Sequence, residues 1–334
     1  MTNKVYVAFG TYETGNNVFL YSYENSKFTH CLSFNAGIRP SYVLFGLNNL
    51  LYVVNECNLG MHNKLGSVRT YKISNEYNSV ELLSEISSEG EDPCSLNLSL
   101  DNKYLLVTNY SSGSVLIYSL DDDGLIEGVK QRLYFKGSGP VEDRQACSHP
   151  HSSYFNKSGD TLYIADLGSD CINLYAWNSN STKLVAQSKD LIPLNKGDGP
   201  RMVCLSEDQN ILYVVNELSN MVRLFDTKSM KEISSESTIE DGLTFSSAAH
   251  IMLKDDHLFV SNRGNDSIMV FGRNAKEWYP SEGKNPRYFS FINDKLFILN
   301  QDGGNVCSYL FKDGLLVNFK QELDIPFPTC MQVK

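Results

Sequence analysis

The sequence predicts an all-β fold, a seven-bladed β-propeller, and three observations lead to this prediction. Short runs rich in aromatic and β-branched residues stand between clusters of Asn, Gly, Asp and Ser, which is the pattern of strands and turns. One such run recurs along the whole chain. Each end of the chain contains only part of a repeat, and the two parts together make one complete repeat, so they can close a ring.

The recurring run has five residues and ends in a small polar residue. Its copies are Leu51–Asn55, Leu105–Asn109, Leu162–Asp166, Leu212–Asn216, Leu258–Asn262 and Leu296–Asn300, with a degenerate seventh copy at Val5–Phe9. A turn and a further strand follow each run. A shorter strand, usually opened by proline, precedes it; these openers are Pro40, Pro93, Pro150, Pro200 and Pro286, with Ala248 in place of proline once.

The seventh opener, Pro328, has no recurring run after it, and the missing partner is Val5–Phe9 at the other end of the chain. We therefore expect the last strand to pair with the first and to close the ring. The repeat spans roughly 40–55 residues with about four strands, as propeller blades do. Closure leaves no long sheet edge exposed. We expect one domain over residues 1–334; the alternative is a β-sandwich with accidental repeats.

Length and charge limit the function classes. The chain has 334 residues, 42% of them hydrophobic, enough for a large core. A net charge of −10 argues against nucleic-acid binding, although a local arginine cluster can still bind an anion. No run of about 18 apolar residues predicts a membrane span. Nucleotide-binding and G-x-S-x-G motifs are absent, so we expect no cofactor and no serine hydrolase.

The cysteines indicate the compartment. Eight of them are scattered along the chain without a C-x-x-C pair, and the start of the chain has no secretory signal pattern. They are expected to be reduced thiols, which predicts a cytoplasmic protein. The sequence leaves the oligomeric state open.

The innermost strand of each propeller blade lines the central channel, and in this chain it is the strand opened by proline. The residues after the openers are therefore expected to face one funnel: Ser41, Cys94, His151, Arg201, Arg287 and Thr329. Charged residues follow some recurring runs at the same end: Glu56, Glu217 and Arg263. These residues could also have purely structural roles. Arg201 and Glu217 could form an ion pair with each other, and Asn and Asp side chains at strand ends often hydrogen-bond to the backbone of nearby turns.

The densest run of reactive side chains is Arg144–Asp170. We expect His151 to face the funnel and His149, before the proline, to face away. Asp166 and Asp170 have the spacing of a turn that fixes a blade corner. The facing of His250, two residues after Ala248, is left open.

Eight motifs are similar to those of a known family. They are G-E-D-P-C-S (90–95), N-Y-S-S-G-S-V (109–115), R-Q-A-C-S-H-P-H (144–151), D-L-G-S-D (166–170), G-D-G-P-R (197–201), L-Y-V-V-N-E (212–217), S-N-R-G-N-D-S-I (261–268) and N-P-R (285–287). In this order the chain resembles the seven-bladed lactonases, which include the cycloisomerase-type 6-phosphogluconolactonase and the fungal carboxymuconate cyclase. The chain departs from the family at Met202, where histidine is common.

The resemblance implies hydrolysis of 6-phosphogluconolactone, a step of the pentose phosphate pathway, or a closely related lactone reaction. It also implies His151, Arg201, Glu217 and Arg287 as the catalytic and binding set, which the funnel argument reached independently. We expect Glu217 or His151 to be the base and Arg201 to stabilise the oxyanion. The expected binders of the small anionic substrate are Arg287, Arg144, Arg263 and Asn109.

Three other functions remain open. One is a cyclase-like lactonising enzyme. The second is a metal-dependent lactonase that uses His149, His151 and nearby aspartates, although no third ligand is fixed and no metal site is assigned. The third is a non-catalytic propeller that binds other proteins, because a fold does not imply a function.

Overall fold

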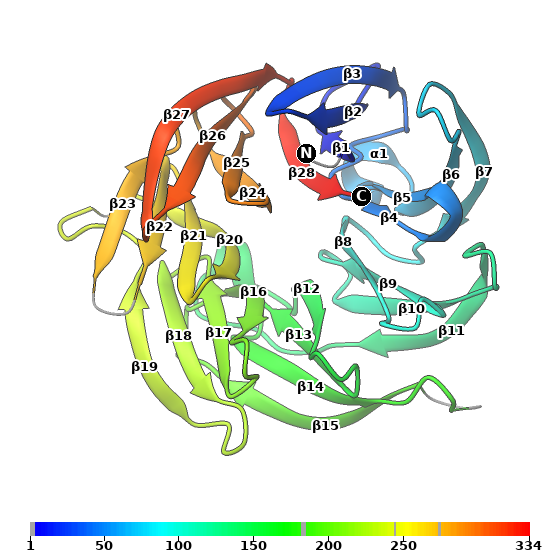
Figure 1. Cartoon of the computed structure of the whole chain (residues 1–334). Helices are drawn as coiled ribbons and strands as arrows, with labels where there is room; N and C mark the ends of the chain where they lie inside the picture. The colour runs from blue at the N-terminus through cyan, green and yellow to red at the C-terminus, as the bar shows by residue number, and fades with distance from the viewer. Residues whose placement is uncertain (1–3, 182–184, 244, 273–274) are drawn as a thin grey trace.

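The protein is a ring of β-sheets around a central axis (Figure 1). The computed structural model describes residues 4–181, 185–243, 245–272 and 275–334. In these residues the strands form seven sheets of four strands each. The prediction of a seven-bladed propeller is confirmed. No helix in these ranges is long and apolar enough to cross a membrane.

Every blade runs from an innermost strand beside the axis to an outermost strand at the rim. In that order, blade 1 contains β4 (Val43–Phe45), β5 (Leu50–Asn55), β6 (Ser67–Ile73) and β7 (Val80–Ser87). Blade 2 contains β8 (Pro93–Leu98), β9 (Tyr104–Asn109), β10 (Ser114–Leu120) and β11 (Ile126–Tyr134). Blade 3 contains β12 (Pro150–Phe155), β13 (Thr161–Asp166), β14 (Cys171–Trp177) and β15 (Ala186–Pro193). Blade 4 contains β16 (Pro200–Leu205), β17 (Ile211–Asn216), β18 (Met221–Asp226) and β19 (Glu232–Ser237).

The remaining three blades follow the same order. Blade 5 contains β20 (Ser247–Lys254), β21 (His257–Arg263), β22 (Ser267–Phe271) and β23 (Lys276–Pro280). Blade 6 contains β24 (Pro286–Ile292), β25 (Lys295–Asn300), β26 (Asn305–Lys312) and β27 (Leu315–Asp324). Blade 7 contains β28 (Pro328–Val333), β1 (Val5–Thr11), β2 (Val18–Glu24) and β3 (Lys27–Phe34). Two short helices, α1 (Leu59–His62) and α2 (Glu142–Gln145), and the 3₁₀ turn η1 (Leu47–Asn49) lie in connections.

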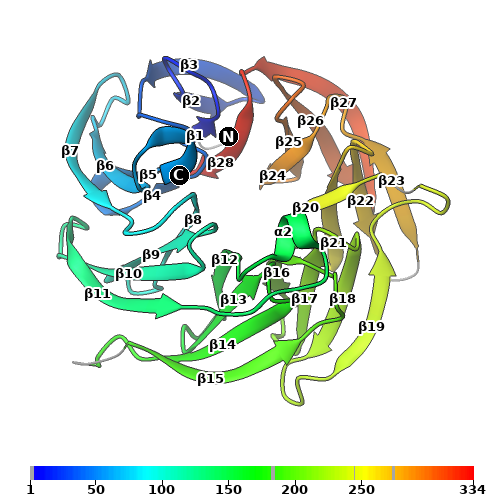
Figure 2. The ribbon, with the colours of Figure 1, turned by 180° about the vertical axis from the view of Figure 1, so that it is seen from behind.

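Blade 7 closes the ring as expected from the sequence. β28 pairs antiparallel with β1, with Val7 opposite Val333 and Gly10 opposite Cys330. The hydroxyl of Thr329 also donates to the carbonyl of Gly10 at 2.9 Å. Both ends of the chain therefore lie in one sheet, beside each other in Figures 1 and 2.

The recurring run is the second strand of each blade, and its continuous hydrophobicity has a physical cause. Successive side chains of a strand point to opposite faces. In β9, Leu105 packs in the cluster towards blade 1, whereas Leu106 packs in the cluster towards blade 3, and both are fully buried. Since a blade is covered on both faces, both faces of this strand must be apolar.

The asparagine that ends the run joins neighbouring blades. In blade 2, the side-chain amide of Asn109 donates to the carbonyl of Ser88, which follows the last strand of blade 1, at 2.9 Å. Asn55, Asn262 and Asn300 donate in the same way to the segment that leaves the preceding blade. These asparagines are fully buried, so their role is structural, but the backbone they bind belongs to the preceding blade and not to the nearby turn expected from the sequence.

Candidate active site

In five blades the channel-facing residue after the opener lies at a β-bulge, which is why it points inward. In blade 3, Pro150 is opposite Asp166 but Ser152 is opposite Ala165, so His151 is the extra residue. The same irregularity marks Cys94, Arg201, Arg287 and Thr329. A bulge bends its strand and re-aims a side chain. The ring therefore brings one re-aimed residue from each of these blades to its centre.

Blade 5 has a longer irregularity, and it settles the facing of His250. Ala248 pairs with Asn262 but Ile251 pairs with Val260, so two residues, Ala249 and His250, are unpaired between them. His250 lines the central channel and is 3% exposed. Its ring packs 4.1 Å from that of Tyr288.

The channel opens at one end into a cavity of about 340 Å³, which we call the mouth. Short helix α2 lies beside the central opening on the face seen in Figure 2. The charged residues that line the mouth are Arg39, Arg144, Arg263, Arg287, Glu56, Asp92 and Glu217. His151, Tyr12 and Tyr110 also line it. Arg201 lies directly behind Glu217 and lines the channel.

Glu217 is the centre of the charge arrangement. Its Oε2 lies 2.9 Å from Nε of Arg201 and 2.9 Å from Nη2 of Arg263, and its Oε1 lies 2.5 Å from Nη2 of Arg144. Only 4% of its side chain is exposed. Burial acts to raise the pKa of this carboxyl, but the arginines hold it well below its usual range. Glu217 is therefore a firmly ionised carboxylate and a weak base.

Arg201 is the most enclosed of the three arginines. Burial, and then the charge of Arg263, lower its pKa to about 9. Its Nη1 also donates to the carbonyl of Ala249. The predicted ion pair with Glu217 is present, but it is one contact in a larger cluster that also contains Arg144 and Arg263.

His151 lines both the mouth and the channel, so it stands where the two meet. Its ring makes an edge contact with Tyr110 at 5.6 Å. Burial, together with the charge of Arg201, lowers its pKa well below the usual value. The imidazole is neutral near pH 7, so one ring nitrogen is free to accept a proton.

A second cluster faces Glu217 across the mouth. The hydroxyl of Tyr12 donates to both oxygens of Glu56, at 2.9 and 3.0 Å. The guanidinium groups of Arg39 and Arg287 lie 4.4 and 5.3 Å from the centre of the Tyr12 ring. Arg39 is paired with Glu56 at 3.0 Å.

Arg287 differs from the other four arginines in its partners. Its one hydrogen bond among the described residues is a long one, 3.5 Å, to the side chain of Gln301, and no carboxylate there forms an ion pair with it. Its charge is therefore available to an anion in the mouth.

Arg144 reaches Glu217 because the neighbouring residues hold its loop in place. The amide of Gln145, which is fully buried, donates to the carbonyl of Leu167 and to the carboxylate of Asp170. Asp170 also accepts from the backbone of Gly197 and Gly199, next to the opener of blade 4. The turn expected to fix a blade corner thus ties the Arg144 loop to blade 4.

Two of the residues considered from the sequence lie away from the mouth. Asn109, expected to bind substrate, is fully buried between blades, where its amide donates to the carbonyl of Ser88 and the hydroxyl of Ser114. An asparagine at the end of a strand can face the funnel and bind substrate, but the side chain at this position lies between two blades. His149 stacks on Tyr110 and its Nδ1 faces the carbonyl of Tyr110, so it faces away as expected.

The ligand set of the metal-dependent alternative is not brought together. Asp166 accepts from the Ser148 hydroxyl and the backbone of His149 and Gly168. Within the described ranges, no three His, Cys, Asp or Glu residues are grouped for a metal ion. Met202 takes the place of the common histidine and lines the channel, with its sulfur 3.9 Å from Arg201.

Sequence reasoning missed Tyr12, and the cause is a register error. Pro328 pairs with Thr11, as Pro93 pairs with Asn109, so Thr11 is the end of the seventh run. The predicted strand is correct, but the copy assigned to Val5–Phe9 lies two residues too early. With the correct register, Tyr12 occupies the position after the run, the one held by Glu56 and Glu217 elsewhere.

The geometry defines a class of protein. A propeller that gathers four arginines at its mouth and a fifth directly behind it, with a buried carboxylate and a neutral histidine, has the groups to bind a small anion and to move a proton on it. The four arginines of the mouth against its three carboxylates leave a formal charge of +1, and Arg201, directly behind Glu217, raises it to +2 for the site as a whole.

Similarity to known proteins identifies the particular family. The chain belongs to the lactonase, seven-bladed β-propeller family, whose model matches residues 5–333. It is 28% identical to a 6-phosphogluconolactonase of Formosa agariphila, over 96% of this chain and 95% of that protein. It is 29% identical to a 6-phosphogluconolactonase of Bacillus subtilis, over 97% and 96%.

Solved structures are similar in fold. A periplasmic gluconolactonase of Pseudomonas aeruginosa superposes with a TM-score of 0.90 at 24% identity, covering 99% of both chains. A Bacteroides fragilis protein described as a putative 6-phosphogluconolactonase gives 0.89 at 22% identity, covering 99% of this chain and 98% of that one.

Proposed function

We propose that this protein is a lactone hydrolase that converts 6-phospho-glucono-1,5-lactone to 6-phosphogluconate. The observation that carries the proposal is the charge of the mouth. A phosphate monoester carries about −1.5 to −2 near pH 7, which matches the formal +2 of the mouth taken together with Arg201 behind it. The names of the two bacterial relatives support the same substrate.

His151 is the better candidate for the base that activates water. A general base works best when its unprotonated form is abundant and still basic. Glu217 is ionised but occupied by three arginines, which makes it a poor proton acceptor, whereas His151 is neutral, has a ring nitrogen unoccupied within the described structure and faces the mouth, although burial lowers its pKa too. The base contributes a factor of roughly 10²–10⁴ to the rate.

Arg201 and Glu217 then have electrostatic roles in the reaction. Arg201 stabilises the negative charge that forms on the lactone carbonyl oxygen, a role worth roughly 10²–10³ in rate. Glu217 aligns Arg144, Arg201 and Arg263 around the reacting group. The phosphate binds on the opposite wall, at Arg287 and Tyr12, with Arg39 behind the Tyr12 ring.

The compartment and pathway follow from the same proposal. We place the protein in the cytoplasm, in the pentose phosphate pathway, where 6-phosphogluconate is formed. All eight cysteines are free thiols, which suits a reducing compartment.

A substrate panel tests the proposal. Hydrolysis above the uncatalysed rate is measured for 6-phosphogluconolactone, gluconolactone and carboxymuconolactone. We expect the highest kcat/KM for the phosphorylated lactone. Preferential turnover of carboxymuconolactone would favour the cyclase-like alternative, and no turnover of any lactone would favour a binding propeller.

A further inference from the structure

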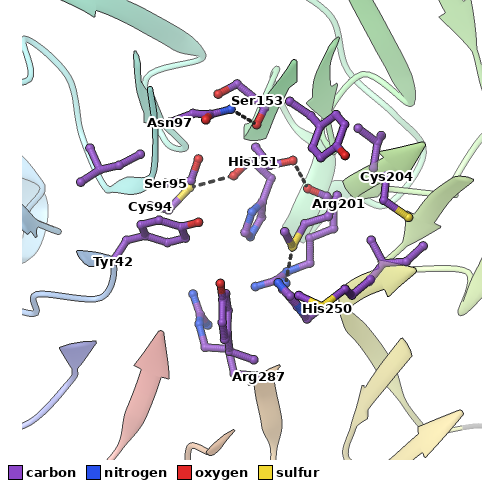
Figure 3. Close-up of a pocket in the computed structure, with 18 of the residues that line it drawn as sticks. Tyr42, Cys94, Ser95, Asn97, His151, Ser153, Arg201, Cys204, His250 and Arg287 are labelled. Atoms are coloured by element: carbon purple, nitrogen blue, oxygen red, sulfur yellow. Dashed lines mark hydrogen bonds between the residues drawn. The ribbon is translucent and has the colours of Figure 1, made fainter. Parts of the chain in front are cut away.

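Behind the mouth, the central channel contains a second compartment with no assigned role. It measures about 420 Å³ and is formed by the inner strands of the blades (Figure 3). Cys94, His151 and Arg287 belong to both hollows, so they form the boundary between them. In Figure 3 the side chains of His151 and Arg287 point into this space.

The charged side chains that line the compartment are all positive among the described residues. Its lining contains Arg201 and Arg287, and none of its described lining residues is Asp or Glu. Arg201 is already paired with Glu217, whereas Arg287 has no ion pair among the described residues. His250 is neutral near pH 7, because burial lowers its pKa to about 3. One unmatched positive charge remains, and this suits a ligand with a single negative charge.

The walls provide two further features. Three buried polar atoms here have no hydrogen-bond partner within the described structure: Oγ of Ser41, Oγ of Ser153 and Nδ1 of His250. Beyond them the lining is mostly apolar, with Leu44, Leu96, Leu205, Met252 and Leu253 towards the ends of their strands, away from the mouth, and the polar side chains of Asn97, Tyr154 and Gln332 among them. The compartment thus changes from cationic at the mouth side to mostly apolar at the far side.

We propose that the channel compartment is a second binding site, for a small monocarboxylic acid with a compact apolar body. The carboxylate binds Arg287 at the boundary, the free serine hydroxyls donate to it or to its substituents, and the apolar body lies among the leucines. A volume of 420 Å³ is within the usual range of small-molecule sites. Because Arg287 also serves the mouth, an acid bound here competes with an anionic substrate for it.

Calorimetric titration with benzoate tests this site, with benzamide as its neutral counterpart of the same shape. We expect benzoate to bind one per chain, at least tenfold more tightly than benzamide. Leu253→Trp fills the far end of the compartment and is expected to weaken benzoate binding at least tenfold. Leu315→Trp, which adds the same ring at a position that is 45% exposed on an outer strand, is the matched control and is expected to leave benzoate binding unchanged.

A second variant that also fills the compartment keeps the test possible if Leu253→Trp does not fold. Ser153→Leu adds bulk on another wall and removes a hydroxyl that has no partner within the described structure. Melting curves verify that each variant is folded. The proposal is overturned if benzoate does not bind, if benzamide binds equally well, or if benzoate still binds to both folded filling variants, since it would then occupy the mouth. These readouts are of binding alone, so they are independent of whether the protein hydrolyses the phosphorylated lactone.

Discussion

Arg144 and Glu217 are 73 residues apart in the sequence, yet Nη2 of the first lies 2.5 Å from Oε1 of the second. Arg144 comes from α2 in the connection between blades 2 and 3, and Glu217 directly follows β17 of blade 4. The arginine side chain is 40% exposed and the glutamate 4%. Arg144 thus covers the mouth-facing side of a carboxylate whose inner side is held by Arg201.

Removing the carboxylate should be costly for stability. Glu217→Ala leaves Arg201 buried without its counter-charge, and breaking a buried ion pair in this way costs about 3–5 kcal/mol. We expect a loss of that size in the free energy of unfolding, measured with urea. Glu232→Ala is the control, because Glu232 is 38% exposed in its pair with Arg223 and an exposed pair contributes about 1 kcal/mol or less. Equal losses in the two variants would contradict the central role of Glu217.

His250 should make stability depend on pH on the acid side. Burial lowers its pKa from 6.5 to about 3, so the unfolded chain binds a proton that the folded chain does not. Its contribution is complete above pH 6.5 and is lost as the pH falls towards 3. Between about pH 7.5 and 5 the wild type should lose about 2 kcal/mol more than His250→Phe. Parallel stability curves for the two proteins would show that His250 titrates normally.

Arg287 should distinguish charged from neutral substrates. Arg287→Gln removes the cation that has no ion pair among the described residues, and a charge-assisted bond is worth about 1.5–3 kcal/mol. The kcat/KM for 6-phosphogluconolactone should therefore fall roughly 10- to 100-fold. The value for gluconolactone, which lacks the phosphate, should change little. A similar loss for both substrates would place Arg287 at the reacting carbon instead.

Tyr12 should act through its ring as well as its hydroxyl. Tyr12→Phe keeps the face on which Arg39 and Arg287 lie but removes the bond to Glu56, whereas Tyr12→Leu removes both. We expect the KM for the phosphorylated lactone to rise about threefold in the first variant and about tenfold or more in the second, since a cation–π contact adds about 0.5–2 kcal/mol. Steady-state kinetics measures both, and an unchanged KM in Tyr12→Leu would remove Tyr12 from the phosphate site.

The sequence predicted the ring and the residues that face its channel because both depend on short repeats. The proline openers mark the innermost strands, and the residue after each opener faces the channel in blades 1, 2, 3, 4, 6 and 7. The bulge that turns this residue inward in blades 2, 3, 4, 6 and 7 was not visible, since a bulge depends on the pairing of two strands and not on one strand alone. Blade 5, which has Ala248 in place of proline, differs: Ala249 and His250 are both unpaired, and His250 is the one that lines the channel.

Other parts of the site depend on tertiary packing that sequence spacing does not contain. Nothing in the sequence indicated that Glu217 binds three arginines, because Arg144 and Arg263 reach it from other blades. Nor did it separate Asn109, which joins blades, from a residue of the mouth. Tyr12 was missed because a degenerate repeat without asparagine leaves its register undefined by two residues.

The most direct test of the account compares two histidines that are two residues apart. His151 lines the mouth and is the proposed base, whereas His149 stacks on Tyr110 outside it. The measurement is kcat/KM for 6-phosphogluconolactone, corrected for uncatalysed hydrolysis, in His151→Asn and His149→Asn. The account predicts a loss of roughly 10²–10⁴-fold in the first and less than about threefold in the second. Wild-type activity in a folded His151→Asn protein would contradict it.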